Sequence, residues 1–126
     1  MLANWRVAGL VFLGGAIGSM LRHVLHDYIA GFFEFPQSEI IALSVVNLLG
    51  SYFLGLVTRH PLFFGNMRQA FFGTGFAGGF TTMSAVTMFI VVEDLTSDIA
   101  LMLFGAVICF AAGWHQGRRA AKKKAA

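Results

Sequence analysis

Residues 73–87 read GTGFAGGFTTMSAVT, and this stretch decides what kind of fold the chain can adopt. Apolar residues flank it, as they would the middle of a membrane-spanning helix, yet it holds four glycines and five hydroxyl side chains. Each glycine costs a helix about 1 kcal/mol relative to alanine. A break at membrane depth is tolerated only where protein, ions or a wet cavity satisfy the freed backbone groups. The stretch therefore predicts an interrupted helix at a functional site; a glycine-rich contact without a break is the alternative.

Composition places the chain in a membrane. Of its 126 residues, 57% are hydrophobic and 12% are charged, against about 25% charged in a typical soluble domain. Four apolar segments, about 5–28, 40–58, 67–92 and 99–117, each approach the ~20 residues that cross a bilayer. The length of the first segment favours a span over a cleaved signal peptide. We expect an all-α membrane protein whose four-helix domain covers residues 1–117, followed by a frayed basic tail at 118–126.

Charged residues divide between the two ends of this predicted bundle. Four crossings place both termini on one side, and eight of the nine Lys and Arg fall there. These eight are Arg6, Arg59, Arg68, Arg118, Arg119, Lys122, Lys123 and Lys124, and the exception is Arg22. All six Asp and Glu fall on the opposite side. The positive-inside rule predicts cytoplasmic termini, one fixed orientation in the plasma membrane, and lipid rather than nucleic acid as the surrounding partner.

The apolar segments lack the groups that catalysis or proton coupling would need. The four histidines lie at helix ends or in connectors, and Cys109 is the single cysteine, so we expect no enzyme. No Asp or Glu falls inside an apolar segment, although a proton-coupled exporter normally needs one there. A small proton-coupled cation or drug exporter is therefore the weaker alternative to a passive pathway.

Neutral polar residues remain inside the predicted membrane region. Ser44, Asn47 and Ser51 are spaced three and four apart, so they share one helix face. Hydrogen bonding between helices explains the serines equally well, whereas a central asparagine is costly to leave unpaired and favours a functional role. In the glycine-rich stretch, freed carbonyls suit a hard cation such as Na⁺. The hydroxyls of Thr82 and Ser84 suit an anion.

Two pairs of glycines have the spacing of close helix contacts. Gly14 and Gly18 form one GxxxG pair, and Gly75 and Gly79 form another. Such pairs let two helix backbones approach closely. Packing within the chain and contact with a second subunit explain each pair equally well.

Three motifs resemble those of the Fluc (CrcB) family of fluoride channels. They are GGAIGSMLRH at 14–23, VNLLGSYFLG at 46–55 and TGFAGGFTTMS at 74–84. The resemblance implies four-helix subunits that pair antiparallel, with fluoride pores at the interface and a structural Na⁺ bound by backbone carbonyls. Gly78 and Thr81 match the sodium positions, Asn47 matches the pore-lining asparagine, and Arg22 matches an arginine near an aqueous vestibule.

The sequence departs from the family pattern at several pore positions. Met83 and Val86 stand where the family has phenylalanines, and Leu43 stands where it often has threonine. The fourth segment, IALMLFGAVICFAAG, has no hydroxyl where the family has Tyr and Ser. With the fixed orientation, these losses favour half of a heterodimer with an inverted paralogue over a homodimer. The expected function is passive fluoride exit from the cytoplasm; a non-conducting partner subunit is an alternative.

Overall fold

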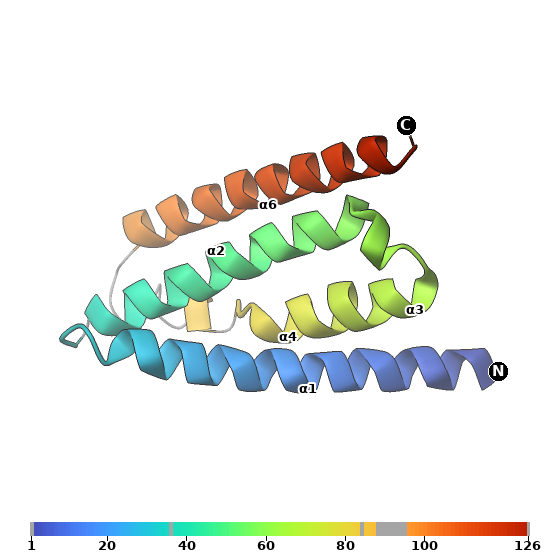
Figure 1. The fold of residues 1–126 in the computed structure, drawn as a ribbon. Helices are drawn as coiled ribbons and strands as arrows, with labels where there is room; N and C mark the ends of the chain where they lie inside the picture. The colour runs from blue at the N-terminus through green and yellow to red at the C-terminus, as the bar shows by residue number, and fades with distance from the viewer. Residues whose placement is uncertain (1, 36, 84, 88–95, 126) are drawn as a thin grey trace.

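The described part of the chain contains three long helices that run along the molecule. They are α1 (Leu2–Ala30), α2 (Gln37–Arg59) and α6 (Thr96–Ala125), and each is long and apolar enough to cross a membrane. The computed structural model describes residues 2–35, 37–83, 85–87 and 96–125, and these residues include no β-strand. The two ends of the chain lie at the same end of the bundle (Figure 1). An all-α membrane fold was predicted and is confirmed.

The third segment is built from short pieces in series. After the 3₁₀ turn η1 (Pro61–Phe63) come α3 (Asn66–Arg68), the π-helix η2 (Gln69–Ala77) and α4 (Gly78–Phe80). Helical geometry then stops at Thr81, whose φ of −80° and ψ of 156° are extended. Residues 85–87 are helical again. The glycine-rich stretch therefore contains the predicted break, and residues 88–92 of the predicted third segment lie outside the described residues.

The first and third segments pack through the predicted glycine pairs. Helix α1 lies against η2 and α4. A Cβ atom added at Gly79 would lie 2.8 Å from Gly15 Cα, and one added at Gly75 would lie 3.1 Å from Gly14 Cα. Gly18 meets the backbone of the same segment. Both GxxxG pairs are therefore used for packing within the chain, which decides between the two alternatives.

The second and fourth helices pack in the same way. A Cβ atom at Gly55 would lie 2.9 Å from Trp114 N, and one at Gly113 would lie 2.9 Å from Leu56 N. Helix α6 continues past Gly117 to Ala125, so residues 118–125 are helical here, where a frayed tail was expected. Alanine, lysine and arginine are good helix formers, and they allow the helix to continue beyond its apolar part.

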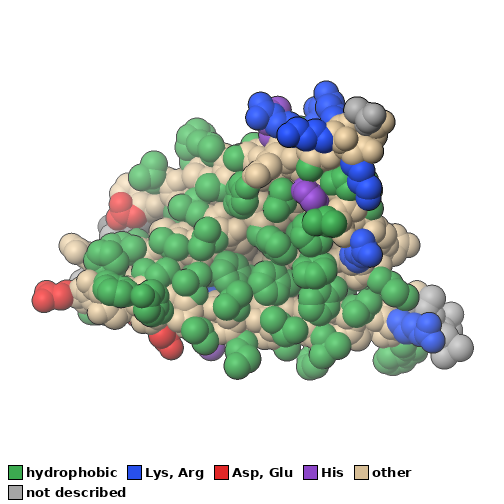
Figure 2. Space-filling view, viewed as in Figure 1, with side chains coloured by type: hydrophobic (Ala, Val, Ile, Leu, Met, Phe, Trp, Pro, Cys, Tyr) green, Lys and Arg blue, Asp and Glu red, His purple; other side chains and the backbone are tan. Residues whose placement is uncertain are grey.

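The outer surface is apolar between two charged ends. Exposed side chains include Trp5, Phe12 and Met20 on α1, and Leu101 and Phe104 on α6. Figure 2 shows hydrophobic side chains over the middle of this face, with Lys and Arg towards one end and Asp and Glu towards the other. A broad exposed apolar surface of this kind is suited to lipid. It agrees with the charge division found in the sequence.

Candidate functional site at the helix break

Asn47 of α2 is hydrogen-bonded to the backbone of Thr82, just beyond the break. Its Oδ1 accepts a hydrogen bond from the Thr82 N–H at 2.9 Å, and its Nδ2 donates to the Thr82 carbonyl at 3.3 Å. Asn47 is only 6% exposed. A buried backbone amide or carbonyl without a partner is costly, and this one side chain satisfies both groups. The backbone N–H and carbonyl of Thr82, which the break leaves without helical partners, are therefore satisfied by a side chain of α2.

Two further contacts fix the residues on the helical side of the break. Ser19 Oγ on α1 donates to the Gly79 carbonyl at 3.2 Å. The Thr81 N–H and the Thr81 hydroxyl both donate to the Ala77 carbonyl at 3.0 Å. The last helical turn is thus hydrogen-bonded to α1 through the Gly79 carbonyl. Thr81, the residue at which the helix ends, bonds back to the same turn.

Other carbonyls at the break accept no hydrogen bond from the residues that the structure describes. Of the hydrogen bonds formed among the described residues, none ends on the carbonyl of Gly78, Phe80 or Thr81. Gly78 is exposed, and no atom lies within 4 Å of the position its Cβ would take. Gly78 and Thr81 line a groove of about 320 Å³ together with Thr74 and Thr58. Carbonyl and hydroxyl oxygens are the ligands that a hard cation prefers.

A second cavity approaches the break from the acidic end of the bundle. It has a volume of about 340 Å³, and its lining includes Arg22, His26, Glu39 and Thr82. Arg22 Nε is buried and has no hydrogen-bond partner among the described residues. Thr81 and Thr82 are adjacent in sequence, yet they line two different concavities. Arg22, the expected vestibule arginine, and Thr82, an expected pore residue, both line the cavity of about 340 Å³.

The two serines of the predicted polar stripe lie apart from that cavity. Ser44 and Ser51 are both half-buried. Ser44 lines a different groove, of about 570 Å³, between α2 and α6, where its neighbours include Met102 and Phe104. The structure therefore does not gather Ser44, Asn47 and Ser51 at one place. Ser84 lies outside the described residues.

The two positions that lack phenylalanine have opposite environments. Met83 is 62% exposed, whereas Val86 is 1% exposed. Val86 packs in a cluster with Leu43, Ile99 and Met102. Of the two positions, only Met83 is therefore exposed on the surface of the subunit.

Several polar residues near the site were not singled out from the sequence. Ser19 directly follows Gly18, and that neighbourhood was the available signal for its bond to the third segment. His26 Nε2 lies 3.1 Å from Glu39 Oε2, and both residues line the cavity, although the sequence indicated only histidines at helix ends or in connectors. Gln69 Nε2 donates to the Val57 carbonyl at 2.8 Å, and no pattern in the sequence indicated it.

Comparisons with known proteins identify the family. Residues 9–115 match the family model described as CrcB-like protein, Camphor Resistance (CrcB). The chain is 32% identical over 119 residues to fluoride-specific ion channel FluC 1 of Halalkalibacterium halodurans, covering 84% of this chain and 93% of that protein. It is 33% identical over 111 residues to FluC 1 of Carboxydothermus hydrogenoformans, with 82% and 87% covered. A shorter match to FluC 2 of Bacillus licheniformis is 43% identical over 82 residues, with 60% and 54% covered.

No solved structure matches the chain in a search of known structures. The family match spans all three motifs and includes the break, Asn47 and Arg22. Together with relatives above 30% identity over most of both chains, it confirms the resemblance noted in the sequence. The chain belongs to the CrcB-like protein family.

Proposed function

We propose that this chain is a subunit of a fluoride channel, through which cytoplasmic fluoride leaves the cell passively. The relatives are named fluoride-specific ion channels rather than enzymes, which supports a channel. The observation that carries the proposal is the break in the third segment, where Thr81 is extended and Thr81 and Thr82 line two different concavities. A break of this kind brings polar backbone and hydroxyl groups to membrane depth.

The cavity lined by Arg22 and Thr82 supplies the groups that a small anion needs. Fluoride is strongly hydrated, so a pathway has to replace its water with hydrogen-bond donors. The Arg22 guanidinium attracts an anion, and the Thr82 hydroxyl can donate. Asn47 Nδ2 has two hydrogens; one reaches the Thr82 carbonyl, and the nearest other acceptor is Met102 Sδ at 3.9 Å, which is weak. Asn47 is 6% exposed and does not line the cavity, so its contribution is to hold the Thr82 backbone beside it.

The opposite groove fits the structural sodium ion that the family resemblance implies. The carbonyls of Gly78 and Thr81 accept no hydrogen bond from the described residues, and both residues line the groove of about 320 Å³. We place Na⁺ at these carbonyls, where it would hold this face against the matching face of a second, inverted subunit. Bound there, the ion would supply positive charge that balances the partial negative charge of the carbonyl oxygens at the interface.

We favour a paralogue over a second copy of this chain as that subunit. Eight of nine basic residues lie at one end of the bundle, so inserting half the copies upside down would oppose the positive-inside rule. Met83 and Val86 provide no aromatic ring edge to face an anion, and α6 has no hydroxyl between residues 99 and 113. A partner with the phenylalanines intact would complete one pore.

Flux from liposomes tests the proposal. The chain is reconstituted alone, with a paralogue of reversed charge bias, and with that paralogue plus Asn47→Ala, and fluoride efflux is recorded with an ion-selective electrode. We expect efflux from the mixed preparation, dependent on Na⁺ and reduced by the substitution. Absence of efflux from every preparation overturns the proposal. Uptake of an organic cation driven by a pH gradient would instead indicate the exporter.

The burial of Val86 favours one second candidate, a non-conducting partner subunit. A side chain that is 1% exposed within the core contributes nothing to an open pathway. If mixed channels conduct equally well with and without the Asn47→Ala substitution in this subunit, the chain serves as a scaffold and the paralogue alone forms the pore.

A further inference from the structure

A basic surface at the end of the bundle that carries both termini forms no ion pair with an acidic residue in the described part of the chain. The four described residues at its centre are Arg59, Arg118, Lys123 and Lys124, and all are exposed. The ion pairs formed among the described residues both involve His26, at the other end of the bundle. In the topology expected from the sequence, all six Asp and Glu fall on the side opposite the termini. The positive charge of the basic surface is therefore available to an external anion.

Trp114 gives the depth of this surface relative to a membrane. The Arg59 guanidinium carbon lies 5.3 Å from the centre of the Trp114 ring, and that of Arg118 lies 5.4 Å from it. Tryptophan is enriched at the level of lipid headgroups, and long basic side chains extend to the same level. The basic surface therefore lies where phosphate groups of one leaflet would lie.

A concave site on this surface combines basic and apolar groups. It has a volume of about 530 Å³ and lies between η1 and the end of α6, with His60, Pro61, Leu62, Ala120, Lys123 and Lys124 as its lining. His60 Nδ1 accepts a hydrogen bond from the Leu62 N–H at 3.3 Å, so His60 Nε2 is left to donate. Leu62 is 64% exposed. The site thus presents donors for a phosphate beside an apolar surface for glycerol and acyl carbons.

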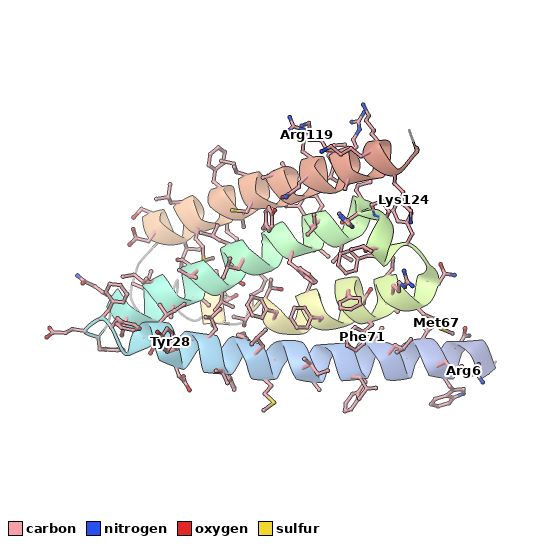
Figure 3. The ribbon with its side chains drawn as sticks, viewed as in Figure 1. Arg6, Tyr28, Met67, Phe71, Arg119 and Lys124 are labelled. Atoms are coloured by element: carbon pink, nitrogen blue, oxygen red, sulfur yellow. The ribbon has the colours of Figure 1, made fainter. Side chains whose placement is uncertain are left out.

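We propose that this site binds the headgroup of an anionic phospholipid. Two lysines and a histidine donor match the charge of a phosphate, and the exposed apolar residues match the rest of the lipid, which free phosphate lacks. Continuation of α6 to Ala125 is what brings Lys123 and Lys124 over η1. Figure 3 shows Lys124 on the side of α6 that faces the end of α2, and Arg119 on the opposite side. The proposal is independent of fluoride conduction.

The lysines have a matched control on the same helix. Lys123→Gln with Lys124→Gln removes two charges that line the site, and Arg119→Gln with Lys122→Gln removes two that do not. Binding of phosphatidylglycerol to the purified protein in detergent is measured by native mass spectrometry and by the shift in unfolding temperature. Phosphatidylcholine with the same acyl chains and soluble glycerol phosphate are measured in parallel.

We expect phosphatidylglycerol to bind and to raise the unfolding temperature, with little effect from the other two compounds. The Lys123/Lys124 double substitution should weaken its binding about tenfold or more, since each basic residue near a lipid surface contributes strongly. The Arg119/Lys122 double substitution should weaken it about threefold at most. Lys123→Arg with Lys124→Arg keeps the charge and should restore binding, which separates lost charge from a disturbed helix.

Three results would overturn the proposal. Equal weakening by the two double substitutions would indicate diffuse attraction with no defined site. Equal binding of phosphatidylcholine would show that negative charge is not recognised. Equal stabilisation by glycerol phosphate would identify a soluble phosphate compound as the ligand.

Discussion

Asn47 and Thr82 are 35 residues apart in sequence and form a two-point hydrogen-bonded pair across the helix break, with distances of 2.9 and 3.3 Å. The pair explains how an extended peptide is tolerated inside the apolar bundle. It also gives Asn47 a positioning role, because holding the backbone of Thr82 from one side leaves the carbonyl of Thr81 for the opposite groove. Both proposed ion sites depend on this peptide.

Removing the Asn47 amide should destabilise the fold. In Asn47→Ala, the Thr82 N–H and carbonyl lose their partner, and we expect a loss of about 1–3 kcal/mol in the free energy of unfolding. Denaturant titration in detergent micelles measures it. Ser44→Ala is the control, since Ser44 is half-buried on the same helix and should cost under about 0.5 kcal/mol. Equal values for the two variants would contradict the positioning role.

Adjacent glycines should respond differently to a methyl group. A Cβ atom at Gly79 would lie 2.8 Å from Gly15 Cα, whereas one at Gly78 would meet no atom within 4 Å. Gly79→Ala should force α1 and α4 apart and cost about 1–3 kcal/mol. Gly78→Ala should leave the subunit's stability unchanged but weaken Na⁺-dependent pairing with a second subunit. Thermal unfolding measures the first effect, and size-exclusion chromatography with and without Na⁺ measures the second; similar unfolding curves for the two variants would refute the packing assignment.

Introducing phenylalanine at position 83 and at position 86 should change the free energy of unfolding by different amounts. Met83 is 62% exposed and Val86 is 1% exposed, so Met83→Phe fits without repacking while Val86→Phe must displace Leu43, Ile99 or Met102. We expect Val86→Phe to lower the free energy of unfolding by about 1–3 kcal/mol, and Met83→Phe to change it by under about 0.5 kcal/mol. Unfolding in detergent is again the measurement. A stable Val86→Phe variant would show that the core around this position can open.

Neutralising Arg22 should slow anion entry without unfolding the protein. We expect Arg22→Gln to lower fluoride efflux about tenfold at low ionic strength, because one positive charge is lost from the cavity that leads to Thr82. The difference should shrink in high salt, where screening weakens attraction at a distance. His23→Gln is the control in the same cavity lining. An effect of Arg22→Gln that is independent of salt would point to altered packing in place of attraction.

Both termini should be found on the cytoplasmic side. Four crossings and the gathering of basic residues at one end predict it, and the two ends of the chain lie at the same end of the structure (Figure 1). A fluorescent-protein fusion at either end should fluoresce, and an alkaline phosphatase fusion should stay inactive. Activity of both reporters at one terminus would mean that the chain inserts in two orientations, and the preference for a paralogue as partner would then fall.

The sequence by itself determined the membrane class, the charge division, the family and the site of the break. These properties are local, since the glycines at 73–79 weaken helix wherever they stand and an apolar segment of about 20 residues suits a bilayer whatever it packs against. The charge division is likewise a property of residue order. The break was predicted correctly because it depends on local residue chemistry, whereas the continuation of α6 to Ala125 was not predicted.

Only the tertiary structure decided which groups meet. The pairing of Asn47 with Thr82, the use of both glycine pairs inside the chain, and the burial of Val86 beside an exposed Met83 depend on how segments distant in sequence pack. Identical spacing is compatible with a helix contact, a subunit contact or a pore. Packing selects among them because a backbone carbonyl or an apolar surface is stabilised only by the atoms that actually reach it.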